Sequence, residues 1–183
     1  MLKEYYTPRL ILKVLDKSYC EEVLSFYLNN KELFERYEAA RPDNFYTTDF
    51  QRACLNYEYV AAQKCANVRF WVYEASNPVK IIGTISFQNI VQSIYKSCQI
   101  GYKFDRNYHH KGYALETVIN ACNIIFDELN LHRIEAYTMP SNEPSKRLLI
   151  NSGFKYEGLL REKALVKNRW EDHELYSLLN NNI

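Results

Sequence analysis

The sequence predicts an α+β fold, with helices on the faces of a mixed β-sheet. Short apolar runs typical of strands recur along the chain, between segments with the apolar period of an amphipathic helix. Strand–helix–strand units of this kind pack helices against a sheet. No repeat, linker or block of like charge interrupts this order. Because 183 residues are an ordinary length for one core, we expect a single domain over residues 1–183.

Composition and charge exclude several classes of function. The 47% hydrophobic and 25% charged shares, with only five Gly and five Pro, predict a fully folded chain. A formal net charge of +1 gives no broad basic field, so we expect no direct nucleic-acid binding. Residues 1–6 lack the apolar run of a secretory signal, and no stretch approaches the roughly 18 apolar residues that span a bilayer. We therefore expect a soluble, cytoplasmic protein with no membrane partner.

The cysteines and histidines predict neither disulfides nor a metal site. Five cysteines, odd in number and widely spaced, fit neither a disulfide framework nor paired zinc ligands. We expect free thiols that mostly fill the core at Cys20, Cys54, Cys65, Cys98 and Cys122. His109 and His110 are adjacent, so their side chains should point apart, and no third ligand has metal-like spacing nearby.

The first half of the chain begins with a strand and a helix. Residues 9–15 predict the strand, and Asp16 or Ser18 can cap the helix that follows. From 31 to 67 the apolar period is poorer and is broken at 41–44, which predicts short helices joined by a loop rich in Tyr and Phe.

The sheet is expected to continue with three strands. Residues 70–74 and 81–87 predict an antiparallel pair around 76–78, a loop that should break pairing. The next strand, 98–104, has Gly101 in its middle, where a missing side chain permits a bulge or a close approach of another backbone or ligand.

The second half predicts two further helices and three strands. Apolar residues at helical spacing indicate one helix over about 112–130, and 133–138 predicts a strand. A short helix follows, capped by Asn142 and ended by Gly153 in the left-handed conformation. The last two strands, about 154–166 and 170–179, are expected to form a hairpin.

The turn of residues 105–114 carries the strongest functional signal. It joins a strand to a helix N-terminus, where unpaired amides and the positive dipole end favour an anion. Gly112 lets the backbone approach phosphate oxygens, and small Ala114 leaves the first helical turn uncrowded. Lys111 and a protonated His110 would add charge. The expected ligand is the diphosphate of a nucleotide-type cofactor, and the alternative for this turn alone is a solvated loop.

Together with the elements around it, this turn resembles the pyrophosphate loop of GCN5-related N-acetyltransferases (GNAT). That loop reads Gln or Arg, two residues, Gly, any residue, then Gly or Ala, which His109-His110-Lys111-Gly112-Tyr113-Ala114 matches except at His109. The departure weakens one side-chain contact and leaves the amide cradle untouched. Within the superfamily the chain is similar to the RimJ/RimL branch of ribosomal-protein N-terminal acetyltransferases. This likeness runs nearly end to end, through Thr7-Pro8-Arg9-Leu10, Arg133-Ile134-Glu135-Ala136, Asn142-x-x-Ser145, Gly153-Phe154, Glu157-Gly158 and Trp170-x-Asp172.

The resemblance implies the GNAT fold and a binding site for acetyl-CoA. The expected sheet is twisted, mostly antiparallel, of about seven strands, and splayed centrally between the strands ending at Phe104 and beginning at Arg133. Pantetheine is expected to pair like a strand along Ile100, Gly101 and Tyr102. The resemblance assigns the diphosphate to His109, His110, Lys111, Gly112, Tyr113 and Ala114, and places Asn142 and Ser145 beside the pantetheine and sulfur. Asn142 as a simple helix cap is the alternative.

The candidate catalytic residues are Glu135, Ser145 and Tyr137. An α-amino group with a pKa near 8 is mostly protonated at neutral pH, so a modest base or ordered water suffices to make it nucleophilic. Glu135 is our candidate base, acting through water, and the alternative is an ordinary ion pair with Arg133. Glu38 and Glu58 remain other possible bases. Ser145 and Tyr137 can offer a hydroxyl to the departing thiolate. We assign no metal.

The expected function is transfer of acetyl from acetyl-CoA to a primary amine by direct attack in a ternary complex. A protein N-terminal α-amino group is the favoured acceptor, and the pocket for it is expected among residues 31–67 and the final hairpin. A small amine, either a polyamine or an amino sugar, is the alternative acceptor. A protein that binds CoA without turnover is a third reading. A monomer and a homodimer fit the sequence equally.

Overall fold

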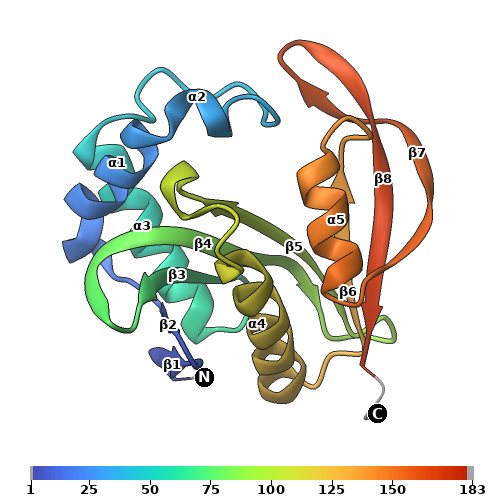
Figure 1. Cartoon of the computed structure of the whole chain (residues 1–183), viewed down its shortest axis with the longest axis horizontal. Helices are drawn as coiled ribbons and strands as arrows, with labels where there is room; N and C mark the ends of the chain where they lie inside the picture. Colours follow the sequence, from blue (N-terminus) through green and yellow to red (C-terminus); the bar gives the residue numbers. More distant parts are fainter. Residues whose placement is uncertain (1, 181–183) are drawn as a thin grey trace.

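In the computed structural model, which describes residues 2–180, helices cover both faces of one eight-stranded sheet (Figure 1). Residues 1 and 181–183, which belong to the expected domain, lie outside the described part. The elements are β1 (Glu4–Tyr6), β2 (Leu10–Lys13), the 3-10 turn η1 (Lys17–Tyr19), α1 (Cys20–Asn29), α2 (Lys31–Phe34), α3 (Thr48–Gln63), β3 (Val68–Glu74), β4 (Asn77–Val91), β5 (Ser97–Phe104), the 3-10 turn η2 (Arg106–Tyr108), α4 (Tyr113–Leu129), β6 (Arg133–Thr138), α5 (Glu143–Asn151), β7 (Lys155–Val166) and β8 (Arg169–Leu179).

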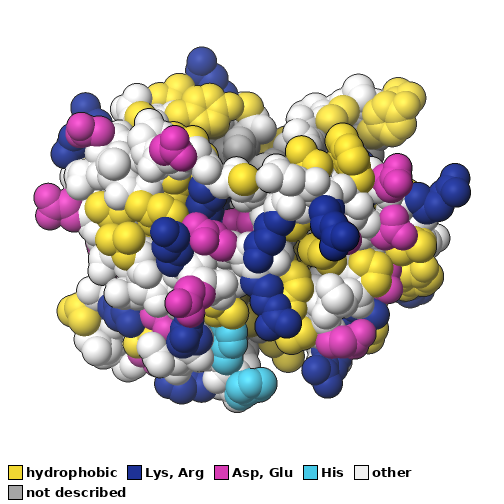
Figure 2. Space-filling model, turned by 90° about the horizontal axis from the view of Figure 1, so that it is seen from above, with side chains coloured by type: hydrophobic (Ala, Val, Ile, Leu, Met, Phe, Trp, Pro, Cys, Tyr) yellow, Lys and Arg dark blue, Asp and Glu magenta, His cyan; other side chains and the backbone are white. Residues whose placement is uncertain are grey.

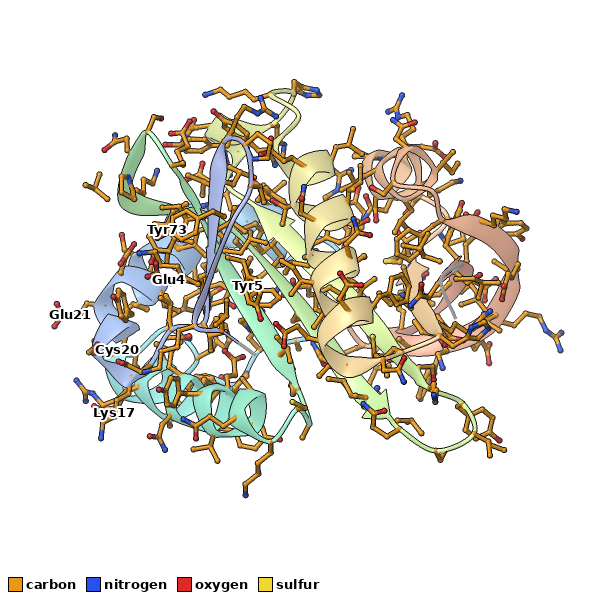
Figure 3. All side chains as sticks on the ribbon, turned by 90° about the horizontal axis from the view of Figure 1, so that it is seen from below. Glu4, Tyr5, Lys17, Cys20, Glu21 and Tyr73 are labelled. Atoms are coloured by element: carbon orange, nitrogen blue, oxygen red, sulfur yellow. The ribbon has the colours of Figure 1, made fainter. Side chains whose placement is uncertain are left out.

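The sheet is mixed and mostly antiparallel, as predicted. Its strand order is β1-β2-β3-β4-β5-β6-β8-β7, and only β5 and β6 run parallel. The eighth strand, β1, was not predicted because three residues are too few to show a period. It pairs with β2 and carries Tyr5, which is labelled in Figure 3. Tyr5 packs edge-on against Phe70 and donates a hydrogen bond to Glu128 of α4, 2.8 Å away.

Two hydrophobic cores lie on opposite faces of the sheet. One contains Val118, Cys122 and Ile125 of α4 with Leu149 of α5, so we call this side the α4–α5 face. The other joins buried residues of α1 and α3 to alternate residues of β2–β4, and we call it the α1–α3 face; its members include Val23, Phe26, Leu55, Trp71 and Tyr73. The alternation is cleanest on β6, where Ile134, Ala136 and Thr138 are buried and the residues between them are partly exposed, as the period of two predicts.

The sheet splays in its centre, between β5 and β6. Their parallel register runs from Ser97 opposite Arg133 to Ile100 opposite Ala136 and then stops. Beyond this point Gly101–Phe104 pair only with β4, while Tyr137 and Thr138 pair only with β8. One edge of each central strand is therefore open, as the GNAT resemblance implies.

Three local predictions need correction. Residues 31–67 do not form only short helices, because α3 runs for 16 residues from Thr48, with Thr47 as its side-chain cap. Few of its residues are buried, which explains the weak apolar period. The loop at 76–78 does not break pairing, since Glu74 pairs with Asn77 and β4 begins there. Pro78 is tolerated because β5 pairs with β4 only from Gly83 onward. At Gly101 the register with β4 is regular, so the predicted alternative of a bulge is wrong.

Candidate functional site

A cavity of about 970 Å³ occupies the splay between β5 and β6. Its walls come from the open edges of both strands, the turn before α4, the first residues of α5, and the segment after α2. Seen from above, the surface is notched between the lobe of α1–α3 and the lobe of α5, β7 and β8 (Figure 2). Of the cofactor residues predicted from sequence, Lys111 alone is missing from the cavity wall.

The turn before α4 has the backbone of an anion cradle. Gly112 is the N-cap of α4 and has a left-handed φ of 78°, while His110 has a φ of 60°. A side chain at Gly112 would be strained, and its Cβ would lie 3.3 Å from Arg9 Nη2. No side chain caps α4, so its first amide groups remain available to a ligand.

Arg9 and Glu116 hold this turn in place. The Arg9 side chain pairs with the Glu116 carboxylate at 2.6 Å and donates to the Lys111 carbonyl oxygen at 3.0 Å. Thr7 also donates to Glu116, at 2.6 Å. Burial alone would raise the pKa of Glu116, but the hydrogen bonds from Thr7 and Arg9 outweigh it, so the pKa lies below its usual range. The sequence motif at residues 7–10 is therefore a support for the turn, a role that sequence reasoning missed.

Two basic side chains of the turn contact other parts of the protein. His109 places Nε2 3.1 Å from the Phe104 carbonyl oxygen, which ties the turn to the end of β5. The Lys111 ammonium lies over the Tyr108 ring, 4.7 Å from its centroid. The residues of the turn that line the cavity are Tyr108, His109, His110, Gly112, Tyr113 and Ala114.

Gly101 lies on the open edge of β5, on the α1–α3 face. It belongs to a cross-strand row in which Arg69 of β3 is paired with Ser86 of β4, and Ser86 with Gly101. A Cβ at Gly101 would meet only Ser86 Oγ, at an ordinary 3.6 Å. Because packing within the protein does not require glycine here, its absent side chain fits the close approach of a ligand.

On the α4–α5 face, Tyr102 and Ser145 form a hydroxyl pair. Their oxygens are 2.9 Å apart, and either can be the donor. Burial raises the pKa of Tyr102, which keeps its hydroxyl protonated. Asn142 accepts the backbone N–H of Ser145 at 3.4 Å, so it is the predicted helix cap, and it also lines the cavity.

Glu135 and Tyr137 belong to an ionic network on β6. Arg133 donates to Glu135 at 2.7 Å, and Tyr137 donates to the other Glu135 oxygen at 2.6 Å. Tyr137 lines the cavity, whereas Glu135 does not. Burial and the hydrogen bond to Glu135 raise the pKa of Tyr137 to about 12. The predicted alternative, an ion pair between Glu135 and Arg133, is present in the structure.

The same arginine also anchors β7. Arg133 Nη1 donates to Glu157 at 3.0 Å, and Ser177 donates to the same carboxylate at 2.5 Å. Hydrogen bonds from Arg133 and Ser177 lower the pKa of Glu157 to about 2. Arg133 is therefore shared by two carboxylates, so the network serves the packing of the final hairpin as well as Glu135.

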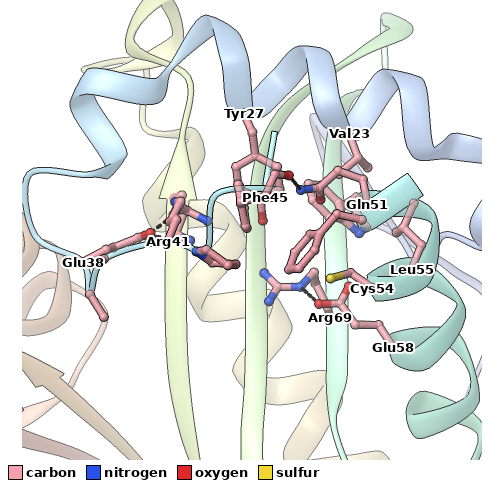
Figure 4. Close-up of a pocket in the computed structure, with 16 residues that line it drawn as sticks. Val23, Tyr27, Glu38, Arg41, Phe45, Gln51, Cys54, Leu55, Glu58 and Arg69 are labelled. Carbon is pink, nitrogen blue, oxygen red and sulfur yellow. Dashed lines mark hydrogen bonds and ion pairs between the residues drawn. The ribbon is translucent and has the colours of Figure 1, made fainter. Parts of the chain in front are cut away.

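A second cavity, of about 370 Å³, lies beside the first under α1 and α3 (Figure 4). Both cavities share Glu38, Arg69 and Lys103 in their walls, while Glu58 lines only the smaller one. Both glutamates were predicted from the sequence as candidate bases, whereas the cations were not predicted. A signal for Arg69 was present, since this charged residue lies between the apolar residues Val68 and Phe70 of β3.

Neither a metal centre nor a membrane-spanning helix is found in the described chain. Within residues 2–180, no three side chains among His, Cys, Asp and Glu gather as ligands for a metal ion. In the same range, none of the helices is both long and apolar enough to cross a bilayer. The five cysteines are free thiols, as predicted.

Comparison with known proteins gives matches along almost the whole chain. Residues 9–155 match the model of the acetyltransferase (GNAT) domain. A probable N-acetyltransferase of Bacillus subtilis, YjcK, is 33% identical over 93% of this chain and 94% of its own. The Escherichia coli [ribosomal protein uS5]-alanine N-acetyltransferase is 25% identical over 94% of this chain and 88% of its own.

Solved structures show the same fold. The ribosomal-protein-S5-alanine acetyltransferase of Vibrio fischeri superposes with a TM-score of 0.91 at 26% identity, over 98% of this chain and 97% of that one. Mycobacterium smegmatis RimJ, solved in complex with CoA-disulfide, superposes with a TM-score of 0.87 at 21% identity, over 95% of this chain and 83% of that one.

Proposed function

Since the chain belongs to the GNAT family of acetyltransferases, we propose that it transfers acetyl from acetyl-CoA to a primary amine, and that this amine is the α-amino group of a protein N-terminus. The observation that carries the proposal is the splay between β5 and β6. It joins a backbone anion cradle, a glycine on an open strand edge and a partly buried hydroxyl pair in one cavity. The relatives named for ribosomal-protein acetylation support a protein acceptor.

The residues present fit acetyl-CoA. The amides at the start of α4 suit the diphosphate, with Gly112 allowing close approach and Arg9 fixing the turn. The open edge of β5 at Ile100, Gly101 and Tyr102 suits the amide groups of pantetheine, which can pair with it like a strand. When bound, acetyl-CoA supplies an activated acetyl group as a thioester.

The reaction requires two proton transfers. The amine nitrogen attacks the thioester carbonyl, a C–N bond forms, the C–S bond breaks, and the sulfur leaves as thiolate. In our proposal Ser145, whose hydroxyl lies 2.9 Å from that of Tyr102, donates a hydrogen bond or proton to the sulfur. Tyr102 then serves as a positioning residue for Ser145. Tyr137 remains the other candidate donor.

We keep Glu135 as the proposed base, acting through water or through the Tyr137 hydroxyl that faces the cavity. In this role Glu135→Gln should reduce turnover most at low pH, where more of the acceptor amine is protonated and must lose its proton. Cofactor affinity should stay nearly unchanged. The measurement is the pH profile of kcat/KM, with calorimetry for acetyl-CoA affinity.

Glu157→Gln is the matched control for this prediction. Glu157 shares Arg133 with Glu135, but it accepts a hydrogen bond from Ser177 and none from Tyr137, whose hydroxyl faces the cavity. A loss of the ion pair alone should therefore affect both variants alike. If the two variants had the same pH profile of kcat/KM, Glu135 would have only a structural role and would not act as the base.

Charge argues against the polyamine alternative. The smaller cavity is lined by three cationic side chains, Arg41, Arg69 and Lys103, and by two carboxylates, Glu38 and Glu58. An excess of positive charge repels a polycation. Amino sugars are not opposed by this argument and remain the alternative acceptor, while Ser145 and Tyr137 in the cavity argue against a binding protein without turnover.

The test of the proposed function is a thiol-release screen. The protein is incubated with acetyl-CoA and a panel of N-terminal peptides, polyamines and amino sugars, and free CoA is measured over time. We expect release with peptides and mass-spectrometric acetylation of their α-amino group. Release of CoA only with amino sugars would identify an amino sugar as the acceptor in place of a peptide. If none of the amines in the panel caused release of CoA, the enzymatic proposal would be contradicted.

A further inference from the structure

The smaller cavity is a side chamber of the cofactor cavity on the α1–α3 face. It is bounded by α1, by α3 and by the loop between α2 and α3, and it shares Glu38, Arg69 and Lys103 with the wall of the larger cavity. The row of Arg69, Ser86 and Gly101 runs from this chamber to the open edge of β5. A molecule held at Arg69 therefore extends toward the strand edge along which we place the thioester.

The charges in the chamber do not balance. Glu38 contacts both Lys103, at 2.6 Å, and Arg41, so one carboxylate faces two cations. Glu58 pairs with Arg69 at 2.7 Å. The side chains of all five groups are at least three quarters buried, where unpaired charge is costly. The chamber thus holds one positive charge more than its carboxylates neutralise.

Hydrogen-bond donors in the chamber are also left over. Arg69 uses Nε for Glu58 and Nη1 for Thr84, and its Nη2, which makes no hydrogen bond within residues 2–180, is not a fully buried atom and stays accessible to a ligand. Arg41 uses Nη2 for Glu38, and its Nε is buried without a partner in the same range. A buried donor without a partner, here Arg41 Nε, is rare in native proteins and calls for an acceptor. In Figure 4 the guanidinium group of Arg69 points into the cavity, below Phe45.

The walls around these donors are aromatic. The Arg41 guanidinium lies 3.8 Å from the centroid of the Phe45 ring. The rings of Tyr27 and Trp71 pack against each other, with their centroids 6.0 Å apart. Burial, the largest influence, lowers the pKa of Lys103 below its usual value, while Glu38 opposes the shift. Aromatic walls exclude water, so an anion would interact with these cations more strongly than at an exposed site.

We propose that this chamber binds an anionic group of the acceptor, a carboxylate or a phosphate, through Arg69 and Arg41. The inference rests on the proposed function and narrows its substrate class to amines that carry a negative charge close to the reacting nitrogen. An acidic residue at the start of a peptide and the phosphate of a small phosphorylated amine share this chemistry. A guanidinium group suits both anions because its donors are arranged in a planar fork.

The experiment compares acceptors that differ only in this charge. One arm uses peptides with Asp or Asn at the first or second residue, and the other uses phosphoethanolamine against ethanolamine. For the unmodified protein we expect kcat/KM to favour the charged member of at least one pair by roughly 10- to 100-fold, the range of a charge-assisted hydrogen bond. The arm that shows the preference identifies the source of the anion.

Variants assign the preference to the chamber. We expect two changes to remove the preference: Arg41→Gln, and separately the double variant Glu58→Gln with Arg69→Gln. In each variant, kcat/KM for the charged and the uncharged acceptor should differ by less than about threefold. The double variant replaces an ion pair by two amides, which avoids leaving a buried charge alone. Because each ratio compares two acceptors in one variant, a change in proton transfer at Glu58 cancels. Arg52→Gln is the control, since Arg52 is half exposed and pairs with exposed Asp49.

The outcomes separate this inference from the proposed function. Acetylation without any preference for the charged acceptors overturns the inference and leaves the function standing. A preference that survives both variants overturns the assignment to Arg41 and Arg69. In parallel, calorimetry measures binding of the acetylated Asp and Asn peptides and of N-acetylated phosphoethanolamine and ethanolamine, so the chamber is tested even if no amine turns over. Equal affinities within every pair would then refute the anion site.

Discussion

Replacing Gly112 with Glu is expected to lower the affinity for acetyl-CoA by more than about 100-fold, the loss that follows when charge-assisted contacts to the diphosphate are replaced by repulsion. Gly112 caps α4 with a φ of 78° and lines the cavity. A carboxylate here would put bulk and negative charge where we place the phosphates. Isothermal titration calorimetry with acetyl-CoA measures the change directly.

Two companion variants separate charge from strain. Gly112→Ala carries only the backbone strain of a side chain at positive φ, about 1–2 kcal/mol. Gly112→Gln adds nearly the same bulk as Glu without the charge. We expect affinity to fall in the order Ala, Gln, Glu, with the largest step between Gln and Glu. Equal affinities of the Gln and Glu variants for acetyl-CoA would show that the diphosphate does not bind at this turn.

Replacing Ser145 with Ala is expected to slow acetyl transfer by on the order of 100-fold, which is typical for loss of a donor to a developing negative charge. Ser145 lines the cavity, and its hydroxyl pairs with that of the partly buried Tyr102. Its loss should act on the departing thiolate and leave acetyl-CoA affinity nearly unchanged. Single-turnover measurements are suitable because they isolate the chemical step from product release.

Ser152→Ala provides the control on the same helix. The Ser152 hydroxyl donates to the Leu148 carbonyl oxygen at the end of α5, and Ser152 does not line the cavity. We expect turnover close to that of the unmodified protein. Tyr102→Phe should give an intermediate loss, since it removes the partner that orients Ser145. A Ser145→Ala rate within twofold of the unmodified protein would make the Ser145 side chain dispensable and direct attention to Tyr137.

These two predictions depend on local features that the sequence already indicated. The turn was recognisable because Gly112 stands just before a helix with a clear apolar stripe, and the structure confirms that helix from Tyr113 to Leu129. The strand at Arg133–Thr138 and the cap at Asn142 were also predicted correctly. In these segments, neighbouring residues supply the whole signal.

The roles of Arg9, Arg69 and Lys103 were not predictable in the same way. Arg9 contacts Glu116, which is 107 residues away along the chain. Arg69 and Lys103 are brought beside Glu38 and Glu58 only when β3 and β5 pair with β4 under α3. No periodicity within a segment encodes such contacts. The ion pair of Glu135 with Arg133 was foreseen, but its hydrogen bond from Tyr137 was not.

The sequence by itself determined the fold class, the order of most elements and the position of the anion turn, because periodicity, caps and glycine positions are properties of short segments. The tertiary structure decided where the sheet opens, which side chains support the turn, and that three cations and two carboxylates share one chamber. These features depend on strand pairing between distant segments, and on the burial that makes unequal charge energetically significant. For that reason the site proposed for acetyl-CoA could be predicted from the sequence and its family resemblance, whereas the anionic character that we propose for the acceptor emerged only from the folded chain.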